Sequence, residues 1–335
     1  MAVSNIAYTT LLGDQDIRLL HLHPEAHGSL APIRCSLVPS TLAESSEYEA
    51  LSYMWGSEID LKTLYIDGKE CPVRDNLWQA LHHLRLPTKT RILWVDALSI
   101  NQNDNSERNH QVSQMGMIYR QAKTVLVWLG QPKLSDTTRE SGFEPLQREL
   151  SAFREDRPKR RDSSLRSSMV YSRLLDVRNV CLAEYWSRLW IIQEVVLASD
   201  IKLICEWSVT VTWTFLTEYL DFLNTDERGF AKWAKDQVER PSWQVGHHFS
   251  QPVGSIENDY FAIRKALLDS VPARLCYERQ LRENYSYAFN PNTSLLSLIQ
   301  VYGSAKCVGM PVHSYECSKK QSGRSEMTSH SLCQD

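Results

Sequence analysis

The fold is decided by the stretch Leu93–Gly130, LWVDALSINQNDNSERNHQVSQMGMIYRQAKTVLVWLG. It contains two nearly continuous apolar runs, at 92–98 (ILWVDAL) and 124–129 (TVLVWL). Between them, apolar side chains recur at helical spacing, at Val112, Met115, Ile118, Tyr119 and Ala122. A helix that joins two such runs is typical of a parallel sheet whose two faces are both covered. We expect this helix to start at Asp104 or Ser106.

The residues before this stretch add short strands and one helix. Branched residues predict strands at 17–22 and 33–38, and the run YEALSYMW predicts another at 48–55. Residues 63–73 (TLYIDGKECPV) are typical of a hairpin because Asp67-Gly68 suits a type I′ turn. Asp75 can then cap a helix over 76–86.

The residues after this stretch change character. We expect a loop insertion over about 131–168, helices over 169–182 and 184–198, a hairpin over 201–213 and a helix over 214–224. The whole pattern predicts an α/β protein of flavodoxin-like, doubly wound type. Its sheet is expected to be mostly parallel, with added hairpins and a mainly helical C-terminal region.

Composition excludes several classes of function. The formal net charge is −3, so no global charge favours binding to nucleic acid. The most apolar run, 189–198, is about half the length of a membrane span, and the N-terminus lacks the features of a secretory signal. No CxxC pair marks a metal site. We therefore expect a cytoplasmic protein with no metal, membrane or nucleic-acid partner.

Three blocks of this sequence together resemble the fungal heterokaryon incompatibility (HET) domain. They are YEALSYMWG (Tyr48–Gly56), the stretch Leu93–Gly130 and YWSRLWIIQEVVLA (Tyr185–Ala198). The resemblance implies an effector of fungal non-self recognition that promotes programmed cell death through self-association, after an upstream protein triggers it. It also implies a TIR-like fold, because HET domains are distantly similar to TIR domains.

The resemblance divides the chain into four segments. Residues 1–47 supply strands that pack on the core, 48–199 form the HET domain, and 200–306 are a hairpin with a helical extension. After about Cys307 the sequence matches nothing in the family. We expect residues 307–335 to be disordered or an aberrant tail, such as the product of a retained intron.

The similarity to TIR domains implies a second function, because some TIR domains hydrolyse NAD. Their catalytic glutamate lies in a W-C-x-x-E motif, and Trp190–Glu194 has the same form with Ile191 in place of Cys. Glu194 would then be the catalytic carboxylate of an NAD glycohydrolase that stabilises positive charge on the ribose. NAD would be a substrate, and no cofactor would be required. Whether the domain is an enzyme stays open at this point.

The residues themselves support a special role for Glu194. It is the only charged residue in the apolar run 189–198, and a buried carboxylate needs a partner, a cavity or a raised pKa. The structural alternatives are an ion pair with Arg188 or Arg120, or a position on an exposed helix face. Helical spacing places Trp190 and Glu194 on one face.

The other candidate ligand-binding residues lie at or after the ends of predicted strands, where ligands bind in parallel sheets. They are Ser52, Tyr53, Trp55, Gly56, Asp96, Asn101 and Gln102. Ser52 and Tyr53 are included because the resemblance to TIR domains implies a Ser-Phe or Ser-Tyr motif at that place. Several have a structural alternative: Trp55 as a core residue, Gly56 as part of a tight turn, Asp96 as a cap for the next turn, and Asn101 and Gln102 as loop-holding side chains. We interpret Glu107-Arg108 in the first turn of a helix as structural, making an ion pair or a capping contact.

Overall fold

A computed structural model describes most of the first 225 residues and a short segment further on. The described residues are 6–11, 13–24, 32–43, 47–156, 173–188, 190–205, 209–225, 265–273, 275–276 and 279. The tail predicted at 307–335, and most of the predicted extension beyond 225, lie outside these residues. The division into four segments therefore remains a prediction.

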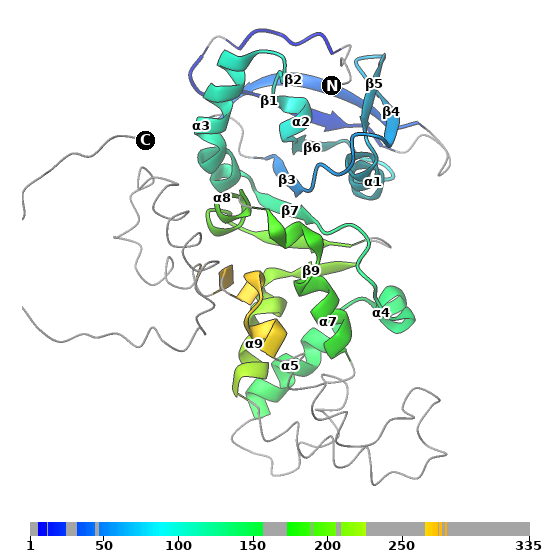
Figure 1. Ribbon diagram of the computed structural model, residues 1–335, viewed down its shortest axis with the longest axis vertical. Coiled ribbons are helices and arrows are strands. Elements are labelled where there is room, and N and C mark those ends of the chain that lie inside the picture. The colour runs from blue at the N-terminus through cyan, green and yellow to red at the C-terminus, as the bar shows by residue number, and fades with distance from the viewer. Residues whose placement is uncertain are drawn as a thin grey trace, which may run out of the picture.

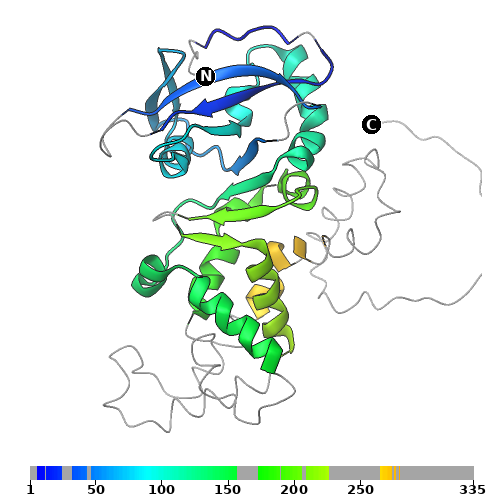
Figure 2. The same cartoon turned by 180° about the vertical axis from the view of Figure 1, so that it is seen from behind.

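Nine strands in the described part of the chain form one sheet in the order β5-β4-β2-β1-β6-β3-β7-β8-β9. The strands are β1 (Asp16–Leu22), β2 (Arg34–Thr41), β3 (Glu49–Tyr53), β4 (Leu61–Ile66), β5 (Lys69–Arg74), β6 (Arg91–Trp94), β7 (Thr124–Trp128), β8 (Ile201–Ile204) and β9 (Thr210–Thr212). Figure 1 shows β1, β2, β4 and β5 at one end of the sheet and β9 toward the other. The turned view in Figure 2 shows α5, α7 and α9 gathered beyond β9.

The sheet is mixed, so the prediction of a mostly parallel sheet is wrong. The four central strands β6, β3, β7 and β8 are parallel, and β2 pairs in parallel with β4. The four other pairings are antiparallel: β1 with β2, β1 with β6, β4 with β5, and β8 with β9. The buried runs indicated the parallel centre correctly. The strands of the added hairpins belong to the same sheet, and consecutive strands joined by a short connection pair in the antiparallel direction. The sheet as a whole is therefore mixed.

Helices cover both faces of the central strands. In β3, Leu51 and Tyr53 belong to one buried cluster together with Leu77 and Leu81 of α1 (Asp75–Leu84). Ala50 belongs to the other cluster, with residues of α3 (Asn105–Gln121) and α8 (Ile191–Val196). This alternation follows from the period of two along a strand.

The other helices of the described residues all come after β6 in the chain. They are α2 (Asp96–Ser99), α4 (Asp136–Ser141), α5 (Glu144–Asp156), α7 (Leu174–Cys181), the 3-10 helix η1 (Glu184–Ser187) and α9 (Trp213–Thr225). The loop predicted over 131–168 is therefore helical over α4 and α5. No helix of the described ranges is both long and apolar enough to cross a membrane.

Several local predictions are confirmed and two are wrong. Asp67 and Gly68 have φ of 50° and 79°, as a type I′ turn requires. Asp104 caps α3 by accepting hydrogen bonds from two backbone N–H groups. Asp75 is not a cap, because it lies inside the first turn of α1 after Arg74. The helix predicted over 184–198 is broken, because Arg188 is extended (φ −74°, ψ 141°) between η1 and α8.

Candidate functional site

The site begins where two parallel neighbours, β3 and β6, end at the same edge of the sheet. Trp55 follows β3 by two residues, and Asp96 follows β6 by two residues. The Trp55 Nε1–H donates a hydrogen bond of 2.8 Å to Asp96 Oδ2. In the sheet, β3 lies between β6 and β7, which both come later in the chain and pair with β3 in parallel. Open α/β sheets bind ligands at such a point, where successive connections lead to opposite sides of one strand.

The break between η1 and α8 brings a second part of the site together. Arg188 donates from Nη1 and Nη2 to the two carboxylate oxygens of Glu194, each at 3.0 Å. The Glu194 side chain is fully buried, whereas 18% of the Arg188 side chain is exposed. Of the structural alternatives for Glu194, the ion pair with Arg188 is confirmed and the exposed helix face is wrong.

Ser52 and Tyr185 complete a buried polar cluster around this ion pair. Ser52 lies on the α8 side of β3, and its hydroxyl donates to Glu194 Oε2. The Tyr185 hydroxyl lies 2.5 Å from Ser52 Oγ. Ser52, Tyr185 and Glu194 are each at most 2% exposed. This set of hydrogen bonds compensates for burial of the carboxylate.

Burial governs the protonation of both acidic side chains. It raises the pKa of Glu194, and the Arg188 guanidinium and the Ser52 hydroxyl oppose that rise. Burial alone would lower the pKa of Arg188, but the Glu194 carboxylate beside it raises that pKa above its ordinary value. Burial also raises the pKa of Asp96, against the opposing hydrogen bond from Trp55.

A pocket of about 510 Å³ lies between these two parts of the site. Among the predicted site residues, it is lined by Trp55, Gly56, Asp96, Gln102 and Glu194. Ser52 does not line it but lies behind Glu194 as its hydrogen-bond partner. Trp190 lines it as well, so the predicted shared face of Trp190 and Glu194 is confirmed.

Three other predicted site residues have mainly structural contacts. Gly56 has φ of +74°, which a glycine adopts without strain. Asn101 lines neither pocket; its side-chain oxygen accepts from the Asn103 backbone N–H and holds the loop. The Gln102 amide donates to the Asp96 backbone carbonyl at 3.0 Å, so it holds the turn and also lines the pocket.

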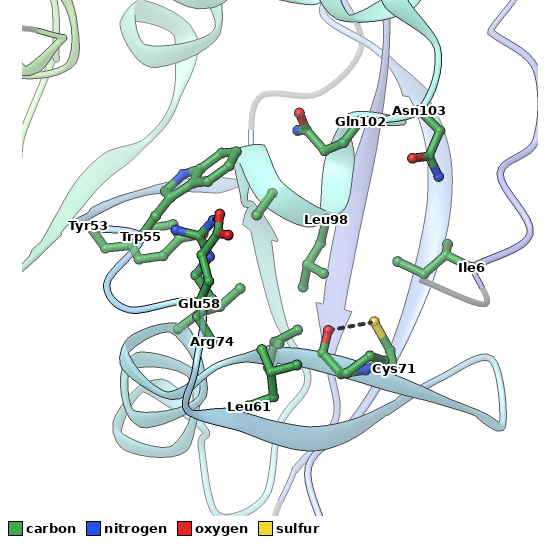
Figure 3. Close-up of a pocket in the computed structure, with 14 residues that line it drawn as sticks. Ile6, Tyr53, Trp55, Glu58, Leu61, Cys71, Arg74, Leu98, Gln102 and Asn103 are labelled. Atoms are coloured by element: carbon green, nitrogen blue, oxygen red, sulfur yellow. Dashed lines mark hydrogen bonds and ion pairs between the residues drawn. The ribbon is translucent and has the colours of Figure 1, made fainter. Parts of the chain in front are cut away.

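A smaller pocket of about 230 Å³ lies on the other side of Trp55. Figure 3 shows Tyr53 and Leu98 on its inner side and Leu61 of the hairpin below them. Arg74 pairs with Glu58 at its rim, and its guanidinium carbon lies 5.2 Å from the centre of the Trp55 ring. Trp55 lines both pockets and is 37% exposed, so its interpretation as a core residue is wrong.

Sequence reasoning missed two contributors to the site. Arg108 was expected to be structural, in an ion pair or a capping contact, but Glu107 binds Arg18 and Arg108 lines the larger pocket. Tyr185 lies in the stretch Tyr185–Ala198 that resembles the family, but it was not predicted to be a site residue. Its position three residues before Arg188 carries no periodic signal, because the chain leaves the helix between them.

These features lie in a region that matches a known class of protein. Residues 48–194 match the family described as Heterokaryon incompatibility protein (HET). Every residue that lines the larger pocket falls within this range. The resemblance expected over 48–199 is therefore confirmed for most of its length.

One curated relative is similar to part of the chain. The chain is 38% identical over 136 residues to "Heterokaryon incompatibility protein 6, OR allele" of Neurospora crassa. That match covers 37% of this chain and 20% of the relative, so it spans about a fifth of the relative's length. No solved structure matches the chain.

Proposed function

We propose that this chain is an effector of heterokaryon incompatibility, the fungal response to non-self. The single observation that carries the proposal is the convergence on one pocket of three segments from the matched range 48–194. Its lining comes from the end of β3, from α2 and α3, and from Arg188 to Glu194 of the α8 region. If the chain shared only its fold with the family, these three segments would not need to meet at one cavity.

In this proposal the protein promotes programmed cell death in the cytoplasm. An upstream protein triggers it, and self-association carries the signal. The similarity to the Neurospora protein supports the biological setting, and the pocket supplies a surface whose occupancy can regulate assembly.

Inducible expression in Neurospora crassa hyphae tests the cellular role. We expect the wild-type chain to arrest growth and permeabilise cells, and Trp190→Ala to weaken this effect because Trp190 is 41% exposed and lines the pocket. Leu175→Ala is the matched control, since Leu175 is 56% exposed and lines neither pocket. Normal growth of hyphae with verified wild-type expression would refute the role.

Sedimentation velocity over a hundredfold range of protein concentration tests self-association. We expect the mean sedimentation coefficient to rise with concentration. A single monomeric boundary at every concentration would remove self-association from the proposal and leave the incompatibility role to the hyphal experiment.

A second candidate function is hydrolysis of NAD, with Glu194 as the catalytic carboxylate. One observation favours it: Glu194, Asp96 and two tryptophans line one pocket. The contacts of Glu194 weigh against it, because Arg188 and Ser52 already engage both of its oxygens. Asp96 is less buried than Glu194 and has no ion pair among the described residues, so it is the better placed of the two carboxylates.

Release of nicotinamide from NAD by the purified chain tests this alternative. Turnover that is lost in Glu194→Gln but kept in Asp96→Asn would support the original assignment. Loss in Asp96→Asn alone would move the catalytic role to Asp96. Absence of turnover in folded, concentrated wild-type protein would exclude the candidate.

A further inference from the structure

Arg108 differs from the three other charged side chains that line the larger pocket. Its guanidinium has no hydrogen bond or ion pair with any residue that the structure describes, although the side chain is partly buried. It lies in the first turn of α3, next to Glu107, which instead pairs with the buried Arg18. A partly desolvated guanidinium offers up to five donors in a fixed, planar arrangement.

The two carboxylates of the pocket are already occupied. Asp96 Oδ1 accepts from the Ala97 backbone N–H at 2.7 Å, and Oδ2 accepts from Trp55 at 2.8 Å. Both oxygens of Glu194 accept from Arg188. Neither acid forms an ion pair with Arg108 among the described residues, so the guanidinium remains available to a ligand.

Apart from Gln102, the remaining walls of the pocket are apolar and aromatic. Trp55 and Trp190 are 37% and 41% exposed, and Ile100, Val112 and Met115 add aliphatic surface. The volume of about 510 Å³ is within the range of small-molecule sites. Exposed tryptophans beside a cavity favour flat rings that stack on or pack against them.

We propose that this pocket binds an organic anion with a flat aromatic body. Arg108 binds its carboxylate or phosphate through paired hydrogen bonds, and the ring packs between the tryptophans and the aliphatic wall. The inference rests on the pocket and not on the incompatibility role, so either can fail without the other.

Isothermal titration calorimetry with three matched probes tests this inference. The probes are 1-naphthoate, 1-naphthyl phosphate and the neutral 1-naphthalenemethanol, each titrated into the full chain at low salt. We expect at least one anion to bind at least tenfold more tightly than the neutral probe. The tighter of the two anions then shows whether the site prefers a carboxylate or a phosphate.

Variants of two arginines on the same helix connect the binding to Arg108. We expect Arg108→Gln to lose the preference for the anion, and Arg108→Lys to retain part of it because a charge remains. Arg120→Gln is the matched control, since Arg120 is exposed in the last turn of α3 and lines neither pocket. Circular dichroism confirms that each variant is folded.

Three results would overturn the inference. Binding of neither anion to the wild-type protein at millimolar probe is one, and equal binding of anionic and neutral probes is another. The third is an Arg108→Gln protein that keeps the wild-type preference for the anion.

Discussion

Two of the bidentate Arg–Glu ion pairs among the described residues, Arg18–Glu107 and Arg188–Glu194, are arranged in opposite ways. In the pair Arg18–Glu107 the arginine is the more buried partner, with side-chain exposures of 1% and 13%. In the pair Arg188–Glu194 the glutamate is the more buried partner, with exposures of 18% and 0%. The first ties β1 to the start of α3, and the second joins the segment before α8 to α8 itself.

The exposure of the carboxylate decides the direction of its pKa. Burial opposes ionisation at Glu107, but hydrogen bonds from Arg18 and from the Asn101 backbone N–H lower its pKa overall. At Glu194 the effect of burial is larger, and the pKa is raised although Arg188 donates to both oxygens. The same pairing chemistry therefore stabilises the carboxylate at one site and only partly compensates for its burial at the other.

The largest effect is expected when the more exposed partner is removed and a buried arginine is left alone. Glu107→Met leaves Arg18 charged, because arginine does not deprotonate in proteins. We expect the free energy of unfolding to fall by about 3–5 kcal/mol, as for other broken buried pairs. Urea unfolding followed by tryptophan fluorescence measures this change.

The control for this substitution is Glu140→Met in α4, where the glutamate is exposed. We expect its stability to stay close to that of the wild type. A Glu107→Met protein as stable as the control would show that Arg18 is adequately solvated by its two backbone carbonyl partners, Thr9 O and Ser99 O.

A slightly smaller loss is expected for Arg188→Met, which leaves Glu194 buried without its partner. The loss should be about 3 kcal/mol near pH 7 and should shrink as the pH falls, because Glu194 can become neutral and Arg18 cannot. Unfolding at several pH values separates the two variants. A loss in Arg188→Met that does not change with pH would contradict the assigned role of Glu194.

The wild-type pairs should contribute to stability in opposite pH ranges. The raised pKa of Glu194 gives stability below the ordinary carboxyl value that is lost as the pH rises through the folded pKa. The lowered pKa of Glu107 gives stability above the ordinary value that is lost as the pH falls through the folded pKa.

Two isosteric variants test this opposition. Relative to the wild type, Glu194→Gln should become more stable as the pH rises above the ordinary carboxyl value. Glu107→Gln should become less stable as the pH rises from strong acid toward that value. Unfolding free energies between pH 3 and pH 7 give both slopes, and two slopes of the same sign would refute the comparison.

The sequence predicted the parts of the fold that depend on local patterns. The buried runs at β3, β6 and β7, the helical spacing in α3 and the turn at Asp67-Gly68 are all read from neighbouring residues. Pairing between distant strands is not local. The positions of β1 beside β6 and of β2 beside β4 could not be derived from spacing, and the mixed sheet was therefore missed.

The candidate site divides in the same way. Trp55 and Asp96 could be placed together because neighbouring parallel strands end at one edge. Arg188 and Glu194 are six residues apart, a spacing that does not bring side chains together on a continuous helix. Only the break after η1 allows their ion pair, and nothing in the apolar pattern of 184–198 indicates that break. The role of Arg108 in the pocket was missed because a structural contact in the first turn of the helix, beside Glu107, was the simpler interpretation.

The smallest expected effect concerns Asp96, the less enclosed acid of the pocket. Trp55→Phe keeps an aromatic ring between the two pockets but removes the Nε1–H that Asp96 Oδ2 accepts. We expect a loss of about 1 kcal/mol in the free energy of unfolding, the net value of one hydrogen bond. The pKa of Asp96 should rise further, because the bond that opposes the effect of burial is gone.

Carbon-detected NMR titration of the Asp96 carboxyl measures the pKa directly, and Trp190→Phe serves as the control because Trp190 donates to no described carboxylate. An unchanged Asp96 pKa in Trp55→Phe would mean that water replaces the indole at this carboxylate, and Asp96 would then lie in a more solvated pocket than its contacts indicate.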